Sequence, residues 1–344
     1  MKKIYEKNVC RACSSLKVLK FKYEHLVFPG KPTFWSNLYC QVCGVISHYK
    51  NDSVYVNYES GEYRADSYNH KSRPPIAPWS EISFLRSLNI VKILKKNKIK
   101  FQSILDYGGY QGYLAYALAA EFNVSATIAD YDKDGLKIAK GLGLNVKNLG
   151  VDKIKNKNYS LILLVHVLEH IDRFETFINN LLKYGAKGAH LYIEVPNLYG
   201  APMSDKAHLM TFSKESLSFL LVRNGFKIVE SGYTSTPDEA FKYNYNYMSN
   251  WENLYFLVQI NKEDINISLD ALNDSKSLSY LLLKLDCMYF WIILSKMLPR
   301  QIKSIFYSLK MLLSYLLVIF LPFGVLKKIP TFLKTFLNFF LKKL

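Results

Sequence analysis

Between residues 101 and 260, short apolar runs alternate with helical stretches, and this alternation restricts the fold more than any other feature. The apolar runs predict buried strands at 101–105, 125–129, 161–165 and 190–195. Helical periodicity predicts helices at 112–121, 133–141 and 172–184. Strands that alternate with helices are joined by right-handed crossovers, so we expect an α/β fold with a parallel sheet.

The flanks of this region carry different patterns. Two strand candidates, 227–231 and 254–260, are separated by loop-like sequence, which predicts an antiparallel pair at one edge of the sheet. Ahead of the first strand, 81–96 has helical periodicity. Its apolar positions are Phe84, Leu85, Leu88, Val91, Ile93 and Leu94.

Two C-x-x-C pairs lie near the N-terminus, Cys10/Cys13 and Cys40/Cys43. No apolar segment follows the first lysines, so we expect a chain without a secretory signal, in which such pairs are metal ligands rather than disulfides. Four thiolates fill a tetrahedral zinc site completely, which is typical of structural zinc. Gly44 permits the tight turn after the second pair. A redox role is disfavoured because neither pair follows a strand at the start of a helix.

A glycine-rich turn follows the first predicted strand, in the stretch Asp106-Tyr-Gly108-Gly109-Tyr-Gln-Gly112. Glycines there let the backbone approach a ligand, and the following helix offers free N–H groups. The acid precedes the glycines, where it could bind the cationic end of a cofactor that carries an amino acid. Asp130 ends the next strand, where it could accept hydrogen bonds from ribose hydroxyls. A plain tight turn is the alternative.

The predicted strand at 161–165 is followed by His166, Glu169 and His170. In a parallel sheet this position faces the ligand crevice. If a helix begins here, the two histidines share one face with Glu169 beside them. A neutral histidine could act as general base toward an acceptor hydroxyl. Alternatively, the segment only caps and braces the structure behind the cofactor.

The C-terminal fifth of the chain is both basic and apolar. Of the net charge of +17, residues 275–344 contribute eleven Lys and Arg side chains against one acid, Asp286. The longest uncharged run is 311–326, which contains Pro322 and Gly324 and is shorter than a spanning helix requires. Lysines among Phe, Tyr and Leu favour helices that lie on an anionic membrane. A helical partner-binding domain and a spanning hairpin are the alternatives, and nucleic acid fits poorly.

Taken together, these motifs resemble class I S-adenosylmethionine (SAM)-dependent methyltransferases over residues 80–262. The resemblance rests on Asp106 to Gly112, Asp130, His166 to Ile171, Glu194-Val-Pro-Asn197, and His208 to Ser213 with Gly225-Phe226. With the cysteine module ahead of it, the chain resembles bacterial sugar C-methyltransferases. One departure concerns the middle glycine of the family's turn, which is replaced here by Tyr110.

The resemblance implies a Rossmann-like sheet of seven strands with one antiparallel strand. It implies a four-cysteine zinc-ribbon module over 1–60, a linker and leading helix over 61–100, the methyltransferase domain over 101–262 and a helical tail over 263–344. The implied residues that bind SAM are Asp106, Tyr107, Gly108, Gly109, Gly112 and Asp130. The implied catalytic residues are His166, Glu169, His170 and His208. In some O-methyltransferases a similar Glu-His pair and a later histidine hold a divalent metal, so His208 is a candidate third ligand.

We therefore expect a cytoplasmic methyltransferase, peripheral or monotopic at the inner membrane face, acting on a sugar in a nucleotide- or lipid-linked glycan. Two alternatives remain. One is methylation of RNA or of a quinone or lipid precursor. The other is a non-catalytic scaffold for membrane glycan enzymes, suggested by Tyr110.

Overall fold

The computed structural model describes residues 9–25, 33–49, 76–150, 154, 158–198, 208–235 and 252–260. The chain divides into two compact units, Met1–Leu269 and Asp270–Leu344, and all described residues belong to the first. The basic tail and residues 61–75 of the predicted linker and leading helix at 61–100 lie outside the described residues. Within the described ranges, no helix is both long and apolar enough to cross a membrane.

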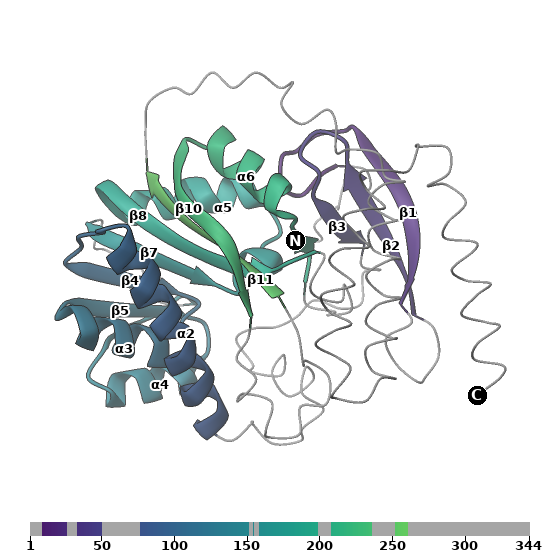
Figure 1. Ribbon diagram of the computed structural model, residues 1–344. Helices are drawn as coiled ribbons and strands as arrows, with labels where there is room; N and C mark the ends of the chain where they lie inside the picture. The colour runs from purple at the N-terminus through teal and green to yellow at the C-terminus, as the bar shows by residue number, and fades with distance from the viewer. Residues whose placement is uncertain are drawn as a thin grey trace, which may run out of the picture. The chain divides into compact units, whose positions relative to one another are not determined.

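The main sheet has seven strands in the order β10-β11-β8-β7-β4-β5-β6 (Figure 1). Its strands are β4 (Ser103–Tyr107), β5 (Ser125–Asp130), β6 (Asn145–Asn148), β7 (Tyr159–Val165), β8 (Gly185–Pro196), β10 (Phe226–Ser235) and β11 (Glu252–Ile260). β11 runs antiparallel to both of its neighbours, and the other pairs are parallel. The predicted parallel sheet with an antiparallel pair at one edge is confirmed.

In the described part of the chain, five helices cover the two faces of this sheet, because its buried strands are apolar on both sides. They are α2 (Ile76–Lys96), α3 (Tyr113–Phe122), α4 (Lys133–Gly141), α5 (Phe174–Leu181) and α6 (Lys214–Arg223). Leu161 and Leu163 pack with α2, α3 and α4, whereas Ile162 and Leu164 pack with α5 and α6. Figure 1 shows α2, α3 and α4 grouped together on one side of the sheet.

Two elements of this domain, β6 and α6, were not predicted from the sequence, and two apolar positions of the leading helix are exposed. β6 has a single apolar residue, Val146, between polar ones, so it lacks the apolar run expected of a strand. α6 starts with a capping box between Ser213 and Ser216, which the sequence analysis did not use. Phe84 and Leu88, counted among the apolar positions of the leading helix, are exposed to 56% and 51%.

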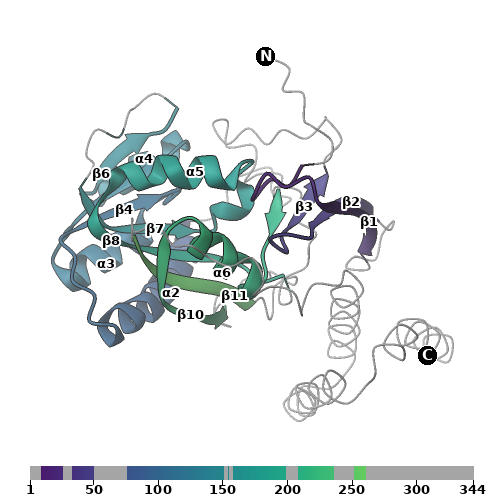
Figure 2. The same cartoon turned by 90° about the horizontal axis from the view of Figure 1, so that it is seen from above.

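The N-terminal residues form a second, four-stranded antiparallel sheet in the order β1-β2-β3-β9. Its strands are β1 (Val18–His25), β2 (Thr33–Cys40), β3 (Ile46–Tyr49) and β9 (Met210–Thr211). Figure 2 shows β1, β2 and β3 side by side. The β1–β2 hairpin occupies the long gap between the cysteine pairs. β9 comes from the chain beyond β8, so the N-terminal sheet is completed by a distant segment.

Candidate active site

The glycine-rich turn lies between β4 and α3, at the carboxyl end of the parallel strands. Gly108 and Gly112 adopt φ values of +79° and +76°, which side chains rarely tolerate. A Cβ atom at Gly109 would stand 2.5 Å from Oδ2 of Asp106. These three glycines are therefore required by the shape of the turn and by its approach to Asp106.

Asp106 is only 2% exposed and is the last residue but one of β4, just before the turn. Its Oδ2 atom is buried and has no hydrogen-bond partner among the described residues. Burial, and next the nearby Asp130 carboxylate, raise the pKa of Asp106 to about 7, although the charge of Arg86 opposes this. A buried carboxylate without a partner is costly, so this group is prepared for a cationic ligand.

Asp130 ends β5 and holds the turn through backbone hydrogen bonds. Its Oδ2 accepts from the N–H of Tyr110 at 2.8 Å, and its Oδ1 accepts from the N–H of Asp132 at 2.9 Å. Tyr110 replaces the glycine by adopting φ +49°, and a Cβ atom at Gly135 would stand 2.4 Å from the Tyr110 ring. A carboxylate has about four acceptor positions, so two remain for ligand hydroxyls.

The segment after β7 differs from the helix that the sequence analysis considered. Residues Leu168–His170 form a single 3₁₀ turn, and His166 before it has φ +56°. His166 and His170 therefore do not share one helical face. The N–H of His166 donates to the carbonyl of Glu194 at 2.8 Å, which places this residue beside β8 instead.

A buried polar network joins His166 to residues that the sequence analysis left out of the site. Nε of Arg86 donates to Oε1 of Glu194 at 2.8 Å, and Nη2 of Arg86 lies 3.1 Å from Nε2 of His166. Glu194 also accepts hydrogen bonds from the Tyr192 hydroxyl and the Asn253 amide. Burial alone would raise the pKa of Glu194, but the Arg86 charge and the bonds from His166 and Tyr192 lower it to about 2.

Glu169 connects this network to the other histidines. Its Oε1 lies 3.1 Å from Nδ1 of His166 and 4.0 Å from Nε2 of His170. Burial would raise the pKa of Glu169, but the hydrogen bond to His166 and the proximity of His170 and His208 lower it to about 2. Burial likewise disfavours charge on His166, yet Glu169 and Glu194 raise its pKa overall.

His170 and His208 lie together on the other side of Glu169. Their ring centroids are 4.9 Å apart in an edge-to-face arrangement. Candidate ligand atoms of Glu169, His170 and His208 all lie within 4.8 Å of one another, and Oε2 of Glu169 has no hydrogen-bond partner among the described residues. The structure thus brings all four residues predicted as catalytic into one chain of contacts. Their roles remain predictions.

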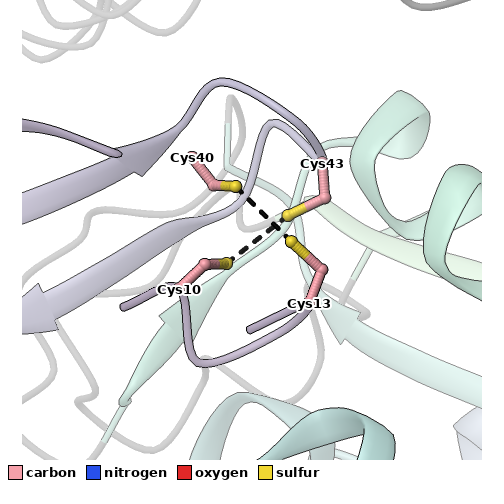
Figure 3. Close-up of side chains that lie close together, drawn as sticks. All are labelled: Cys10, Cys13, Cys40 and Cys43. Atoms are coloured by element: carbon pink, nitrogen blue, oxygen red, sulfur yellow. Dashed lines mark hydrogen bonds between the residues drawn. The ribbon is translucent and has the colours of Figure 1, made fainter. Parts of the chain in front are cut away.

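The four predicted zinc ligands converge from two loops (Figure 3). Sγ of Cys10 lies 3.6 Å from Sγ of Cys43, and Sγ of Cys13 lies 3.5 Å from that of Cys40. All four thiols are free and buried. These separations exclude disulfides but suit tetrahedral zinc, where sulfurs about 2.3 Å from the metal stand roughly 3.8 Å apart.

The two cysteine loops have the same backbone geometry. The N–H of Ser14 donates to the carbonyl of Cys10 at 3.0 Å, and the N–H of Gly44 donates to that of Cys40 at 2.9 Å. Ser14 and Gly44 both have positive φ, at +58° and +72°. The turn expected at Gly44 is present, and the first loop repeats it without glycine. Each loop therefore presents two thiols in one direction, and this donor set fits a structural zinc ion.

Comparison with known families settles the class of the main domain. Residues 85–231, from within α2 to within β10, match a family model described as a methyltransferase domain. The main domain is a SAM-dependent methyltransferase domain. No curated protein matches the methyltransferase by sequence.

Solved structures of SAM-dependent methyltransferases resemble this methyltransferase at low identity. One, from Archaeoglobus fulgidus, shares 16% identity over 57% of this chain and 97% of its own, with a TM-score of 0.40. Another, from Mesorhizobium loti, shares 13% identity over 49% and 96%, with a TM-score of 0.39. Coclaurine N-methyltransferase bound to N-methylheliamine and S-adenosylhomocysteine (SAH) shares 15% over 50% and 70%, with a TM-score of 0.40.

The residues of the glycine-rich turn fit the cofactor of this methyltransferase. The unpartnered Asp106 oxygen would accept the cofactor's ammonium group, and the free acceptor positions of Asp130 would take the ribose hydroxyls. A Cβ atom at Gly108 or Gly109 would collide with Val167 or Asp106, so the turn can lie this close to Asp106 only with glycines. The bound cofactor supplies an activated methyl group on a sulfonium, so the protein chiefly has to position the acceptor and remove its proton.

We expect cofactor affinity to depend on pH through Asp106. Its pKa of about 7 means that the carboxyl is largely protonated at pH 6, whereas binding of an ammonium requires the charged form. The affinity for SAH should therefore rise as pH rises from 5 to 7, and be roughly tenfold lower at pH 6 than on the plateau above pH 8. Calorimetric titration across this range, repeated in buffers of different ionisation enthalpy, measures both the affinity and the released proton.

The stability of the free protein should show the opposite trend. The folded state keeps the Asp106 proton up to about pH 7, while the unfolded state loses it near 3.8, so this group destabilises the fold as pH rises between those values.

An affinity for SAH that stays constant from pH 5 to 8 would contradict the assignment of Asp106 as the ammonium acceptor.

Proposed function

We propose that this methyltransferase transfers the methyl group to oxygen or carbon of a sugar in a nucleotide- or lipid-linked glycan. The observation that carries the proposal is the buried four-cysteine cluster, which shares one apolar core with the methyltransferase helices α5 and α6. A cysteine module ahead of a methyltransferase domain is the combination that resembles bacterial sugar methyltransferases. No observation on the described residues favours RNA, a quinone precursor or a non-catalytic role.

The histidine cluster supplies the proton chemistry that this reaction needs. In O-transfer, an imidazole nitrogen takes the acceptor hydroxyl's proton while the oxygen forms a bond to the methyl carbon and the carbon–sulfur bond breaks. Glu169, ionised by its low pKa, would stabilise the resulting imidazolium of His166 or His170. His208, whose ring lies beside that of His170, would form part of the binding site for the acceptor.

A divalent cation at Glu169, His170 and His208 is a second way to activate an acceptor hydroxyl. The donor set is one carboxylate and two imidazoles, with candidate atoms within 4.8 Å of one another. Such a cation would lower the pKa of the bound hydroxyl. Turnover that is lost with chelator and restored by Mg²⁺ or Mn²⁺, with the cysteine-bound zinc retained, would favour this arrangement over a histidine base.

The acceptor can be tested in the organism that makes the protein. Mass spectrometry of glycans from a strain lacking this chain should show loss of one methyl group from a sugar residue. Restoring the chain should restore the methyl group, whereas restoring the Asp106→Asn variant should not, which separates catalysis from a scaffold role. Unchanged glycans, with loss of a methyl group from RNA or a quinone, would overturn the sugar proposal.

The basic tail is proposed to hold the enzyme at the cytosolic face of an anionic membrane. The support is its composition, since 275–344 places eleven cationic side chains among runs of Leu, Phe and Tyr. Truncation before residue 275 should release the protein from vesicles that contain anionic lipid without changing its affinity for SAH. Co-sedimentation measures the release, and vesicles of neutral lipid are the control. A truncated protein that still sediments with anionic vesicles would refute this location.

A further inference from the structure

We propose that the four-cysteine module positions the histidines of the active site, by holding from two sides the segments that carry His170 and His208. Arg11 of the first cysteine loop holds one segment, and β3, just after the second loop, holds the other. The inference rests on the proposed function in two respects: zinc binds the cysteines, and the histidines act on the acceptor.

The first contact lies just beyond His170. The guanidinium of Arg11 forms an ion pair with the carboxylate of Asp172, two residues after His170. The backbone carbonyl of Arg11 accepts a hydrogen bond from the N–H of Phe174 at 3.2 Å, at the start of α5. Arg11 stands between Cys10 and Cys13, so both contacts begin inside the loop that presents two of the thiols.

The second contact lies just beyond His208. Ile46 and Ser47 of β3 pair with Thr211 and Met210 of β9. β3 starts three residues after Cys43, and β9 starts two residues after His208. Each cysteine loop therefore holds the backbone within a few residues of one active-site histidine.

The two histidine segments also contact each other directly. The N–H of Leu209 donates to the backbone carbonyl of Glu169 at 2.6 Å, and the His170 and His208 rings meet edge to face. Met210 and Phe212, which follow Leu209 in the chain, are fully buried in the same core cluster as the four cysteines. Displacement of either cysteine loop should therefore change the positions of the His170 and His208 rings relative to each other.

A metal held by all four thiolates would join the first loop to the second. In doing so it would fix the separation between Arg11 and β3, and through them the spacing between His170 and His208. Arg11 contacts Asp172 and the backbone of Phe174, next to the segment that carries His170, so we assign it a positioning role. The zinc would act on the reaction only through geometry, because four thiolates leave it no open position.

The test uses the full-length, zinc-loaded protein and the ring ¹³C–¹H NMR signals of its histidines, assigned with His170→Gln and His208→Gln. Arg11→Ala should shift or broaden the signals of His170 and His208. The signal of His190 on β8 and the affinity for SAH should stay within error of the parent protein. Arg11→Lys, which keeps the cation, should restore most of the parent spectrum.

Lys20→Ala is the matched control, since Lys20 lies exposed on β1 of the same module. It should leave all histidine signals in place. Removal of zinc by a chelator under reducing conditions should reproduce the effect of Arg11→Ala, and added zinc should reverse it. Signals of His170 and His208 that are unchanged in Arg11→Ala would overturn the proposal.

The outcomes separate this inference from the function on which it rests. A protein that contains no zinc or does not bind SAH contradicts the proposed function, yet the Arg11→Ala spectrum still reports on the coupling. If chelation unfolds the module, the comparison of Arg11→Ala with Arg11→Lys and Lys20→Ala decides. Normal zinc content and SAH binding with undisturbed histidines would leave the function intact and refute the positioning role.

Discussion

Asp106→Asn is expected to weaken binding of SAH by roughly 100-fold or more, because it removes the buried charge that we predict to accept the cofactor's ammonium group. Calorimetric titration at pH 8, where the parent carboxyl is ionised, measures this loss. The control is Asp134→Asn, on the first turn of α4 with a partly exposed carboxylate paired to Lys137. It should change the affinity by less than about twofold.

The same substitution should leave the fold intact. A carboxyl pKa raised from 3.8 to about 7 corresponds to roughly 4 kcal/mol of cost for the charged form, which Asn does not carry. The free energy of unfolding of Asp106→Asn at pH 8 should therefore equal or exceed that of the parent. A variant that binds SAH normally would show that Asp106 is not part of the cofactor site.

Arg86→Ala is expected to destabilise the protein by about 3–5 kcal/mol, because it leaves the buried Glu194 carboxylate without its cation. Arg86 is 17% exposed and Glu194 is 2% exposed in this pair. Urea unfolding measures the change in the free energy of unfolding. The matched control is Arg223→Ala, whose partner Glu175 is 29% exposed and which should cost at most about 1 kcal/mol.

A second substitution separates charge from packing at this position. Glu194→Gln added to Arg86→Ala removes the uncompensated charge and should recover part of the lost stability. If Arg86→Ala lowers the free energy of unfolding no more than Arg223→Ala does, the buried ion pair does not stabilise the carboxyl end of β8. The network around Arg86 would then not be what holds His166 in place.

Much of the main sheet could be predicted because its strands carry continuous apolar runs and its helices keep their period. The helix over 133–141 begins and ends as predicted, since Asp132 caps its N-terminus and accepts from the N–H groups of Asp134 and Gly135. The N-terminal strands were harder to predict, because β3 is short and pairs with β9, a two-residue strand far along the chain. Nothing local in either segment indicates this partner.

In the candidate site, the residues that belong to local sequence motifs could be predicted. Asp106 and the glycines stand in one strand–turn–helix motif and Asp130 ends the next strand, so their placement followed from neighbours in the sequence. The ion pair between Glu194 and Arg86 could not be predicted in this way, because Arg86 lies 108 residues away on the leading helix. One signal could have found it: Arg86 precedes the buried Ile90 by four residues and thus falls on the inward face of that helix.

The Tyr110 ring packs against Gly135, so there is room between the glycine-rich turn and α4 for only one side chain. A glycine at position 110 would leave that space empty, and any side chain at position 135 would collide with the tyrosine ring. The two positions therefore form a size-matched pair, and neither is free to vary alone. Because the N–H of Tyr110 also donates to Asp130, a substitution at Gly135 on the first turn of α4 would alter the position of the carboxylate that we predict to bind the ribose.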